Sequence, residues 1–280
     1  MNKAGKGLRL AVIGFGAITE EIVRCLDARG ELDTLLGVLD LPQRMPEVRR
    51  KAAGRFAAVD QLDALLDLGA DLVVECAGHG GIKQFGPGVV ARGVDLMIAS
   101  VGVLADRDFA AKFVQAVHGN AQIWIPSGAV AGIDGLLAAR TTGLKHVTYT
   151  SVKPPVAWNG TPAESKLLGA AREQRTAFFV DSAREAAIRY PQNANVGATV
   201  ALAGLGLDRT QVKLVSDPAV SGPLGIIEAD GDFGTFRFEI LAYASPLNPK
   251  TSVITAHSIV MAAREGMCFS ALSALTIATV

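Results

Sequence analysis

The sequence predicts an α/β protein, with a doubly wound parallel sheet in its first half and an α+β domain with a mixed sheet in its second. Three observations support this fold class. Apolar runs of strand length alternate with helix-like segments up to about residue 127. The first run ends at two glycines spaced one apart, and a helix-like segment follows at once. After residue 130, segments rich in Val, Thr, Tyr and Phe predominate.

The strands of the first half are continuous apolar runs, which is typical of a sheet covered by helices on both faces. Their alternation with helices indicates parallel strands joined by right-handed crossovers. The expected strands are Leu8–Ile13, Leu35–Leu39, Leu72–Cys76, Leu96–Ala99 and Ile123–Ile125. The expected helices are Glu20–Arg29, Gln61–Asp67, Phe85–Arg92 and Asp106–Val117.

The turn after the first strand is the first motif that carries chemistry. Gly14 permits a tight turn, and Gly16 lets the backbone approach a pyrophosphate at a helix N-terminus. This pattern opens a dinucleotide-binding (Rossmann) unit, so we expect Gly14, Gly16, Ala17 and Ile18 to bind a nicotinamide or flavin cofactor. Thr19 replaces the third glycine of the G-x-G-x-x-G motif, and we expect it to loosen the packing of helix on strand. The alternative is a glycine-rich turn of another α/β protein.

An acidic residue ends the second expected strand. Asp40 follows Gly16 at close to the spacing, about 20 residues, of a carboxylate that accepts a hydrogen bond from a ribose hydroxyl. Such a carboxylate favours NAD over NADP because it repels a 2'-phosphate. Arg44 is close enough in sequence to weaken that preference. The alternative role of Asp40 is to cap a helix.

The second half of the chain has a different organisation. Its expected strands are Val147–Val152, Val212–Ser216, Gly225–Asp230 and Thr235–Ala242, with a helix of small residues at Val196–Ala203. A last helix, Val253–Arg264, is expected to return to the first domain. We therefore expect a dinucleotide-binding domain over residues 1–129, a substrate and dimerisation domain over 130–252, and a C-terminal helix over 253–280. The nicotinamide end of the cofactor should point at the seam between the domains.

Composition narrows the partners and the compartment. Of 280 residues, 50% are hydrophobic and 19% charged, and the formal net charge is +0. The chain thus supports a large core and offers no basic surface for nucleic acid or for a membrane. Cys25, Cys76 and Cys268 are too far apart for a zinc or disulfide motif, which favours a reducing, cytoplasmic compartment. The apolar segment Phe269–Val280 is too short to span a bilayer.

Two stretches of the second half stand out because polar side chains gather in them. Asn193 and Asn195 lie just before a helix, and Lys250, Thr251 and Ser252 lie at the start of another. Amide, ammonium and hydroxyl groups donate hydrogen bonds, so these residues are candidates for substrate binding. The alternatives are helix capping by the asparagines or the hydroxyls, and a solvated surface charge for the lysine.

Together these motifs resemble the L-aspartate dehydrogenase family over nearly the whole chain. The most specific stretches are Lys153-Pro-Pro155, Tyr190-Pro-Gln-Asn-Ala-Asn195-Val and Asn248-Pro-Lys-Thr-Ser252. The resemblance implies a Rossmann domain, a second α+β domain with a dimer-forming sheet, and NAD(P)-dependent oxidation of L-aspartate to iminoaspartate. That product can feed NAD biosynthesis or hydrolyse to oxaloacetate and ammonia. The resemblance also implies that Ala129 and Asn195 contact the cofactor near the nicotinamide.

One position departs from the family pattern. The family carries an Asn-x-His pair shortly after an Asp-Pro, and its histidine is thought to act as a proton shuttle. The corresponding residues here are Pro223 and Gly225. Glycine has no side chain to take a proton, so we expect the reaction to be slowed or the substrate to have shifted. Lys250 and His257 remain candidates for catalysis, with His79 or a bound water as other candidates for the base, and His257 is alternatively a core histidine.

Two other classes of function stay open. One is a cofactor-binding homologue with weak or no catalysis, acting as a sensor or a structural dimer, which Gly225 favours. The other is an oxidoreductase on the same scaffold that acts on a hydroxy acid or a semialdehyde, because a fold alone does not fix the chemistry. For the amino-acid dehydrogenase, the expected partners are a small amino or imino acid and a second copy of the chain.

Overall fold

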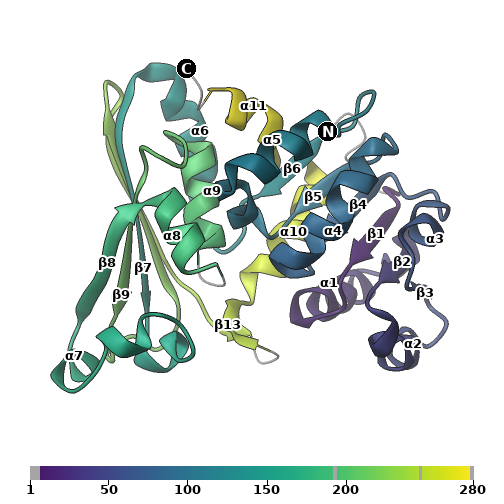
Figure 1. Cartoon of the computed structure of the whole chain (residues 1–280), viewed down its shortest axis with the longest axis horizontal. Helices are drawn as coiled ribbons and strands as arrows, with labels where there is room; N and C mark the ends of the chain where they lie inside the picture. Colours follow the sequence, from purple (N-terminus) through teal and green to yellow (C-terminus); the bar gives the residue numbers. More distant parts are fainter. Residues whose placement is uncertain (1–6, 192–193, 246–247, 278–280) are drawn as a thin grey trace. The chain divides into compact units, whose positions relative to one another are not determined.

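The chain folds as two compact units, seen here in a computed structural model that describes residues 7–191, 194–245 and 248–277 (Figure 1). Unit 1 comprises Met1–Val103, Arg107–Pro126 and Thr255–Leu272. Unit 2 comprises Leu104–Asp106, Ser127–Ile254 and Ser273–Val280. A segment that follows most of unit 2 in the sequence therefore belongs to unit 1.

Unit 1 is built on a sheet with the strand order β14-β6-β5-β4-β1-β2-β3. Strands β1 to β6 pair in parallel, and β14 is antiparallel to β6. The chain order reverses at β1, which lies between β4 and β2, so this is the predicted doubly wound sheet. The strands are β1 Leu10–Ile13, β2 Leu35–Leu39, β3 Ala57–Val59, β4 Leu72–Glu75, β5 Asp95–Ile98, β6 Ile123–Pro126 and β14 Cys268–Ser270.

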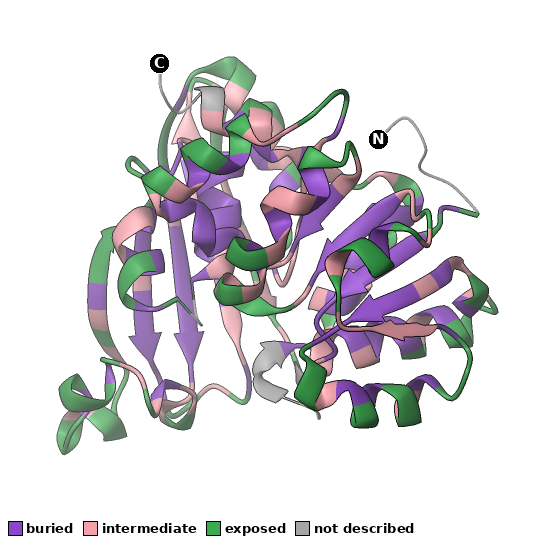
Figure 2. Ribbon diagram, turned by 45° about the vertical axis from the view of Figure 1, so that its right-hand side comes forward, coloured by how far each residue is buried: buried purple, intermediate pink, exposed green. Residues whose placement is uncertain are grey.

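Helices cover the apolar strands of unit 1. They are α1 Ala17–Ala28, α2 Met45–Ala52, α3 Leu62–Leu66, α4 Gly78–Ala91, α5 Arg107–Gln115 and α10 Ile254–Glu265. Ile22 of α1 and Ile259 of α10 share one buried cluster with Val12 of β1 and Val74 of β4. In Figure 2 the central strands are almost entirely buried, whereas the outer helices alternate between buried and exposed residues.

Helix α4 begins at Gly78 rather than at the predicted Phe85. Its glycines lower helix propensity, but they allow close packing. A Cβ atom at Gly88 would lie 2.6 Å from Leu62 Cδ2, and one at Gly81 would lie 2.3 Å from Ala77 Cβ. Close packing therefore explains why this glycine-rich segment is helical, although its local sequence pattern predicts a loop.

Unit 2 contains a mixed sheet with the order β11-β10-β7-β9-β8, in which only β7 and β9 pair in parallel among the described strands. Its strands are β7 Leu144–Lys153, β8 Thr176–Ser182, β9 Gln211–Ser216, β10 Leu224–Gly231 and β11 Gly234–Leu241. Its helices are α6 Ile133–Ala139, α7 Ala170–Glu173, α8 Ala183–Arg189, α9 Asn195–Ala203 and α11 Ala271–Ile277. Small residues of α9 bring it close to the sheet, since a Cβ at Gly197 would lie 3.1 Å from Val212 Cγ2.

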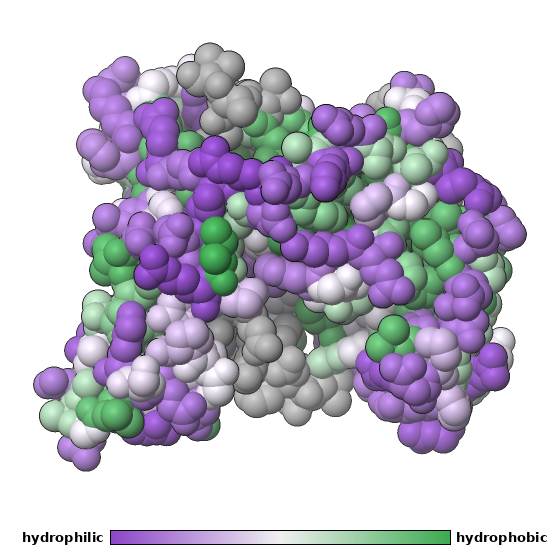
Figure 3. Space-filling view, in the orientation of Figure 1, coloured by the Kyte–Doolittle hydropathy of each residue, from purple (hydrophilic) through white to green (hydrophobic). Residues whose placement is uncertain are grey.

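The segment before the last long helix is extended. Strands β12 Ala244–Ser245 and β13 Asn248–Ser252 form a two-stranded antiparallel sheet, and α10 begins at Ile254. The face in Figure 3 is mostly hydrophilic, with hydrophobic residues in separate patches. None of the helices in the described ranges combines the length and the hydropathy that crossing a membrane requires.

Candidate active site

The turn between β1 and α1 depends on glycine at two places, for different reasons. Gly14 has φ +91°, and a Cβ there would lie 2.8 Å from the Cα of Ala77. Gly16 is extended, and a Cβ there would meet no atom within 4 Å. Gly14 is therefore required by the fold of the turn. The space beside Gly16 is open at the N-terminus of α1, and helix N-termini in general favour anions.

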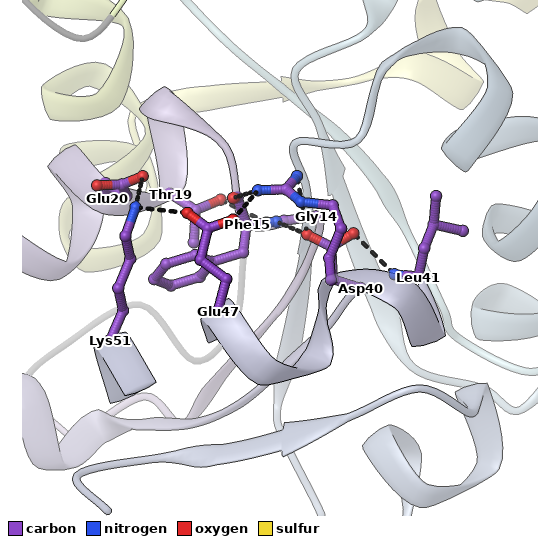
Figure 4. Close-up of polar contacts among 9 residues, drawn as sticks. Gly14, Phe15, Thr19, Glu20, Asp40, Leu41, Glu47 and Lys51 are labelled. Atoms are coloured by element: carbon purple, nitrogen blue, oxygen red, sulfur yellow. Dashed lines mark hydrogen bonds and ion pairs between the residues drawn. The ribbon is translucent and has the colours of Figure 1, made fainter. Parts of the chain in front are cut away.

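Thr19 strengthens this turn, contrary to the expectation that it would loosen it. The side chain is fully buried, and its hydroxyl donates a hydrogen bond to the carbonyl oxygen of Gly14 at 2.6 Å (Figure 4). It also hydrogen-bonds the thiol of Cys76, which follows β4. The residue that replaces the third motif glycine thus ties α1 to the turn.

Asp40 lies at the end of β2 and is held against the same turn. Its Oδ2 accepts a hydrogen bond from the Phe15 N–H at 2.8 Å, and its Oδ1 accepts one from the Leu41 N–H at 2.7 Å (Figure 4). Arg44 Nη1 lies 3.2 Å from Asp40 Oδ2, and Arg44 Nη2 donates to the Phe15 carbonyl at 2.8 Å. An acid and a guanidinium therefore form an ion pair at the end of β2. In dinucleotide-binding domains this position discriminates between the ribose hydroxyl of NAD and the 2'-phosphate of NADP.

A lysine on α2 fastens that helix to α1. Lys51 Nζ lies 2.7 Å from Glu20 Oε1 and 3.0 Å from Glu47 Oε1, and it sits 5.9 Å from the centre of the Phe15 ring. Hydrogen bonds to Glu20 and Glu47 raise the pKa of Lys51. The Phe15 ring thus packs against the ammonium group of Lys51.

Glu75, at the end of β4, was not foreseen from the sequence. It is fully buried, and its Oε1 accepts hydrogen bonds from the Ala77 N–H at 2.7 Å and the Ser100 hydroxyl at 2.8 Å. Its Oε2 accepts from the Ser100 N–H at 3.0 Å. Burial raises the pKa of Glu75. The Glu75 side chain therefore joins the loops after β4 and β5. An acidic residue at the end of an apolar strand is the feature of the sequence that could have indicated this role.

His257, the candidate base, lies on α10 beside α1. Its Nε2 is 3.2 Å from Glu21 Oε1, and its Nδ1 is 3.6 Å from Cys25 Sγ. A hydrogen bond from Arg24 to Glu21 lowers the pKa of that carboxyl. The imidazole thus bridges the two helices of unit 1.

In unit 2, the space beside Gly225 is filled by a residue that the sequence analysis missed. Gly225 pairs with Ser151 of β7 and Ile240 of β11. A Cβ at Gly225 would lie 3.3 Å from the hydroxyl oxygen of Tyr149. Tyr149 is buried and hydrogen-bonded to Ser151, and burial raises its pKa to about 12. A phenol therefore stands next to the glycine that replaces the family histidine.

Polar groups also gather where the parallel strands β7 and β9 end. Lys153 is buried, pairs in register with Ser216, and places Nζ 5.4 Å from the centre of the Trp158 ring. Trp158 Nε1 and Ser216 Oγ are buried and have no hydrogen-bond partner within the described ranges.

The remaining predicted residues belong to unit 2. Ala129 lies in the loop before α6, and Asn195 begins α9, whose N-cap residue is Ala194 rather than an asparagine. The backbone of Lys250 and Thr251 lies in β13, and Ser252 Oγ is buried without a hydrogen-bond partner among described residues. Asn193 and the side chains of Lys250 and Thr251 lie outside the described part of the chain.

The residues predicted to bind the cofactor thus lie together in unit 1: Gly14, Gly16, Ala17 and Ile18 form the turn and the start of α1, and Asp40 is hydrogen-bonded to the turn. A doubly wound sheet with open main-chain groups at the first helix and an acid ending β2 defines a dinucleotide-binding oxidoreductase domain. No group of three His, Cys, Asp or Glu side chains suited to a metal ion occurs in the stretches that the structure describes.

Comparison with known proteins agrees with this class. Residues 14–125 match the family model "Homoserine dehydrogenase, NAD binding domain", and residues 134–266 match "Aspartate dehydrogenase, C-terminal". The chain is 39% identical over 258 residues to L-aspartate dehydrogenase of Ralstonia pickettii, and 42% identical over 261 residues to that of a Polaromonas species. Each match covers 91% of this chain and 96% of the relative. The chain belongs to the L-aspartate dehydrogenase family, whose members are nicotinamide-dependent oxidoreductases.

Solved structures support the fold. Aspartate dehydrogenase from Thermotoga maritima superposes with a TM-score of 0.70 at 24% identity, covering 92% of this chain and 96% of that one. A homoserine dehydrogenase from Thiobacillus denitrificans gives a TM-score of 0.58 at 13% identity, covering 94% of this chain and 75% of that one.

Proposed function

We propose that this protein oxidises L-aspartate to iminoaspartate with NAD or NADP, or runs the reverse imine reduction. The observation that carries the proposal is the open glycine turn of unit 1 in a chain that is about 40% identical to L-aspartate dehydrogenases along most of its length. Iminoaspartate then enters NAD biosynthesis or hydrolyses to oxaloacetate and ammonia.

The cofactor fits the residues that form the turn. Gly16, Ala17 and Ile18 would hold the pyrophosphate, because the space beside Gly16 is open and α1 begins there. When bound, the nicotinamide supplies the hydride acceptor. We propose NAD as the preferred form because Asp40 stands at the ribose end of the turn, with Arg44 close enough to let NADP bind more weakly.

The substrate side of the proposal lies in unit 2. Asn193, Lys250, Thr251 and Ser252 would donate hydrogen bonds to the two carboxylates of aspartate. Ala129 and Asn195 would contact the nicotinamide end of the cofactor. Support comes from Ser252, whose buried hydroxyl has no partner among the described residues and is therefore available to a ligand.

The weakest step is removal of a proton from the substrate ammonium. Gly225 offers no side chain, and Tyr149 beside it stays protonated at neutral pH because its pKa is about 12. His257 or a bound water would take the proton instead. Missing general-base help costs about 10²–10⁴-fold in rate, so the proposed enzyme is slow rather than inactive.

We also propose that the protein is a cytoplasmic homodimer joined through the sheet of unit 2. Support comes from apolar side chains on its two edge strands. Val180 of β8 is 53% exposed, and Leu241 of β11 is 56% exposed. Light scattering on the purified protein tests the dimer, and a single-copy mass would contradict it.

The test of function is a rate measurement with purified protein. Aspartate with NAD or NADP should give the reduced cofactor, and oxaloacetate with ammonia should consume it. Gly16→Val is the matched variant, since its side chain fills the open space beside the turn and should abolish cofactor binding. Absence of turnover in both directions, at high enzyme concentration, would reject the proposal.

A second candidate is favoured by Gly225 and the neighbouring Tyr149. In this alternative the chain binds the cofactor but does not turn it over, and acts as a sensor or a structural dimer. Calorimetry separates the two functions: cofactor binding without turnover supports the alternative, and turnover excludes it.

A further inference from the structure

A cavity of about 230 Å³ opens in unit 2, where α6 and α9 end. Arg140, at the end of α6, and Arg209, shortly before β9, both line it. Glycines 204 and 206 and the apolar side chain of Leu144 form other parts of the wall. No acidic residue lines the cavity among the described residues. Two guanidinium groups thus share one recess with no carboxylate in its wall.

Arg140 is half-buried without a compensating carboxylate. Burial lowers the pKa of its guanidinium, and Arg140 forms no ion pair with any residue in the described ranges. One of its N–H groups donates to the carbonyl oxygen of Leu202 at 3.1 Å. An arginine carries five N–H donors, so this bond uses a small part of its capacity.

The simplest alternative is that Arg140 only caps the end of α9. Two of the last carbonyls of α9 already accept bonds from backbone N–H groups. Gly204 N–H donates to Val200 O at 2.9 Å, and Gly206 N–H donates to Ala201 O at 2.7 Å. Arg140 contributes one capping bond, to Leu202, and its other donors form no hydrogen bond with α9.

The neighbouring acids are engaged with other cations. Asp208 pairs with Arg184 at 2.6 Å, and Asp232, near Gly143 on the rim, pairs with Lys145. Arg209 is exposed, and it makes no hydrogen bond or ion pair with any residue in the described ranges. Both guanidinium groups that face the cavity are therefore without an anion.

We propose that this cavity binds a small oxyanion, a phosphate or carboxylate group of a metabolite. Guanidinium groups bind both kinds of group through paired N–H donors. The volume is below the roughly 300–1,000 Å³ of pockets for drug-sized ligands, so it suits a phosphate or a short dicarboxylate. The site does not depend on the proposed catalytic function.

The test is a titration of the full chain with inorganic phosphate and, separately, with succinate. Ionic strength is kept constant with chloride, and binding is followed by calorimetry and by the midpoint of thermal unfolding. We expect saturable binding of one or both anions that weakens at least tenfold in Arg209→Gln. Arg172→Gln removes the same charge from an exposed position on α7 and should bind like the parent.

The variants also separate this cavity from the turn after β1, which can take phosphate too. Binding that Arg209→Gln leaves unchanged comes from elsewhere and overturns the proposal, as does the absence of saturable binding in the parent. Arg140→Lys keeps the charge but loses the planar fork, and should weaken binding without unfolding the protein. Preference for one anion over the other identifies the group that the site recognises.

Discussion

Two regions differ in how far their buried polar groups are hydrogen-bonded. One is the turn after β1 in unit 1, and the other is the end of strands β7 and β9 in unit 2. In the turn, Asp40 accepts two backbone N–H groups and pairs with Arg44, and the Thr19 hydroxyl donates to Gly14. At the strand ends, Trp158 Nε1 and Ser216 Oγ are buried with no partner in the described part of the chain.

This difference indicates how each region meets its ligand. A satisfied network keeps its geometry without help, so the turn is preformed for the proposed cofactor. An unpaired buried donor costs about 1–3 kcal/mol, which a water molecule or a ligand group would recover. We interpret the strand ends as the region whose hydrogen bonding is completed on binding.

Gly14→Ala is expected to have the largest effect, because it would disrupt the turn after β1. The φ of +91° and the approach to Ala77 leave no room for a Cβ, so we expect a loss of about 3 kcal/mol or more in unfolding free energy, together with loss of cofactor binding. Denaturant unfolding and calorimetry measure both. Gly16→Ala is the control: it should keep the parent's stability and weaken cofactor binding alone. Equal stability of Gly14→Ala and the parent would refute the rigid turn.

Gly225→His tests the corresponding position in unit 2. The new Cβ would lie 3.3 Å from the Tyr149 hydroxyl, so we expect overpacking to cost about 2–3 kcal/mol. Adding Tyr149→Ala makes room for the histidine. The double variant should therefore lose less unfolding free energy than the two single variants lose in total. It should also oxidise aspartate faster, by up to roughly 10²-fold if proton transfer limits the parent. Simple additivity of the two changes would show that the residues do not share space.

Glu75→Gln tests a second hydrogen-bonded network of unit 1, the one that joins the loops after β4 and β5. The amide would turn an N–H toward the Ser100 N–H, so we expect a loss of about 1–2 kcal/mol. The pKa of Glu75 is raised from 4.5, so the parent's stabilisation is fully present below that pH and declines as pH rises through the raised pKa. The deficit of the variant should therefore be largest in acid and shrink toward neutral pH. A deficit that grows with pH would contradict this assignment.

Thr19→Val should have the smallest effect. It keeps the shape of the side chain but removes the hydrogen bond to Gly14, so we expect a loss of about 1 kcal/mol. Thr19→Ser retains the hydroxyl and serves as the control in the same unfolding experiment. If Thr19→Val is as stable as the parent, the hydroxyl does not tie α1 to the turn.

The sequence predicted the parts of the fold whose pattern is local. Continuous apolar runs identified β1 and β4, and two glycines after the first run located the cofactor turn. The helix α2 was missed because charged residues dominate it, and β3 because three residues are too few to show a pattern. The expectation for Thr19 was wrong because the glycine motif takes account only of side-chain size. The buried hydroxyl of Thr19 also forms a hydrogen bond, to the Gly14 carbonyl.

The site in unit 2 was harder to predict because it depends on pairing between distant strands. Tyr149 lies on β7 and Gly225 on β10, and only their antiparallel register brings the phenol beside the glycine. Lys153 was noted in the sequence, but its burial beside Trp158 follows from tertiary packing. Register and burial of this kind leave no signal in a single sequence.

The return of α10 and β14 to unit 1 affects how the molecule is made on the ribosome. Ile259 and Val260 complete the buried cluster that contains Val12 and Ile22, yet they are translated after most of unit 2. Until then a nascent chain carries an unfinished first sheet with an open edge at β6. Chaperones that bind exposed apolar surface are therefore expected to stay on this chain until translation passes β14.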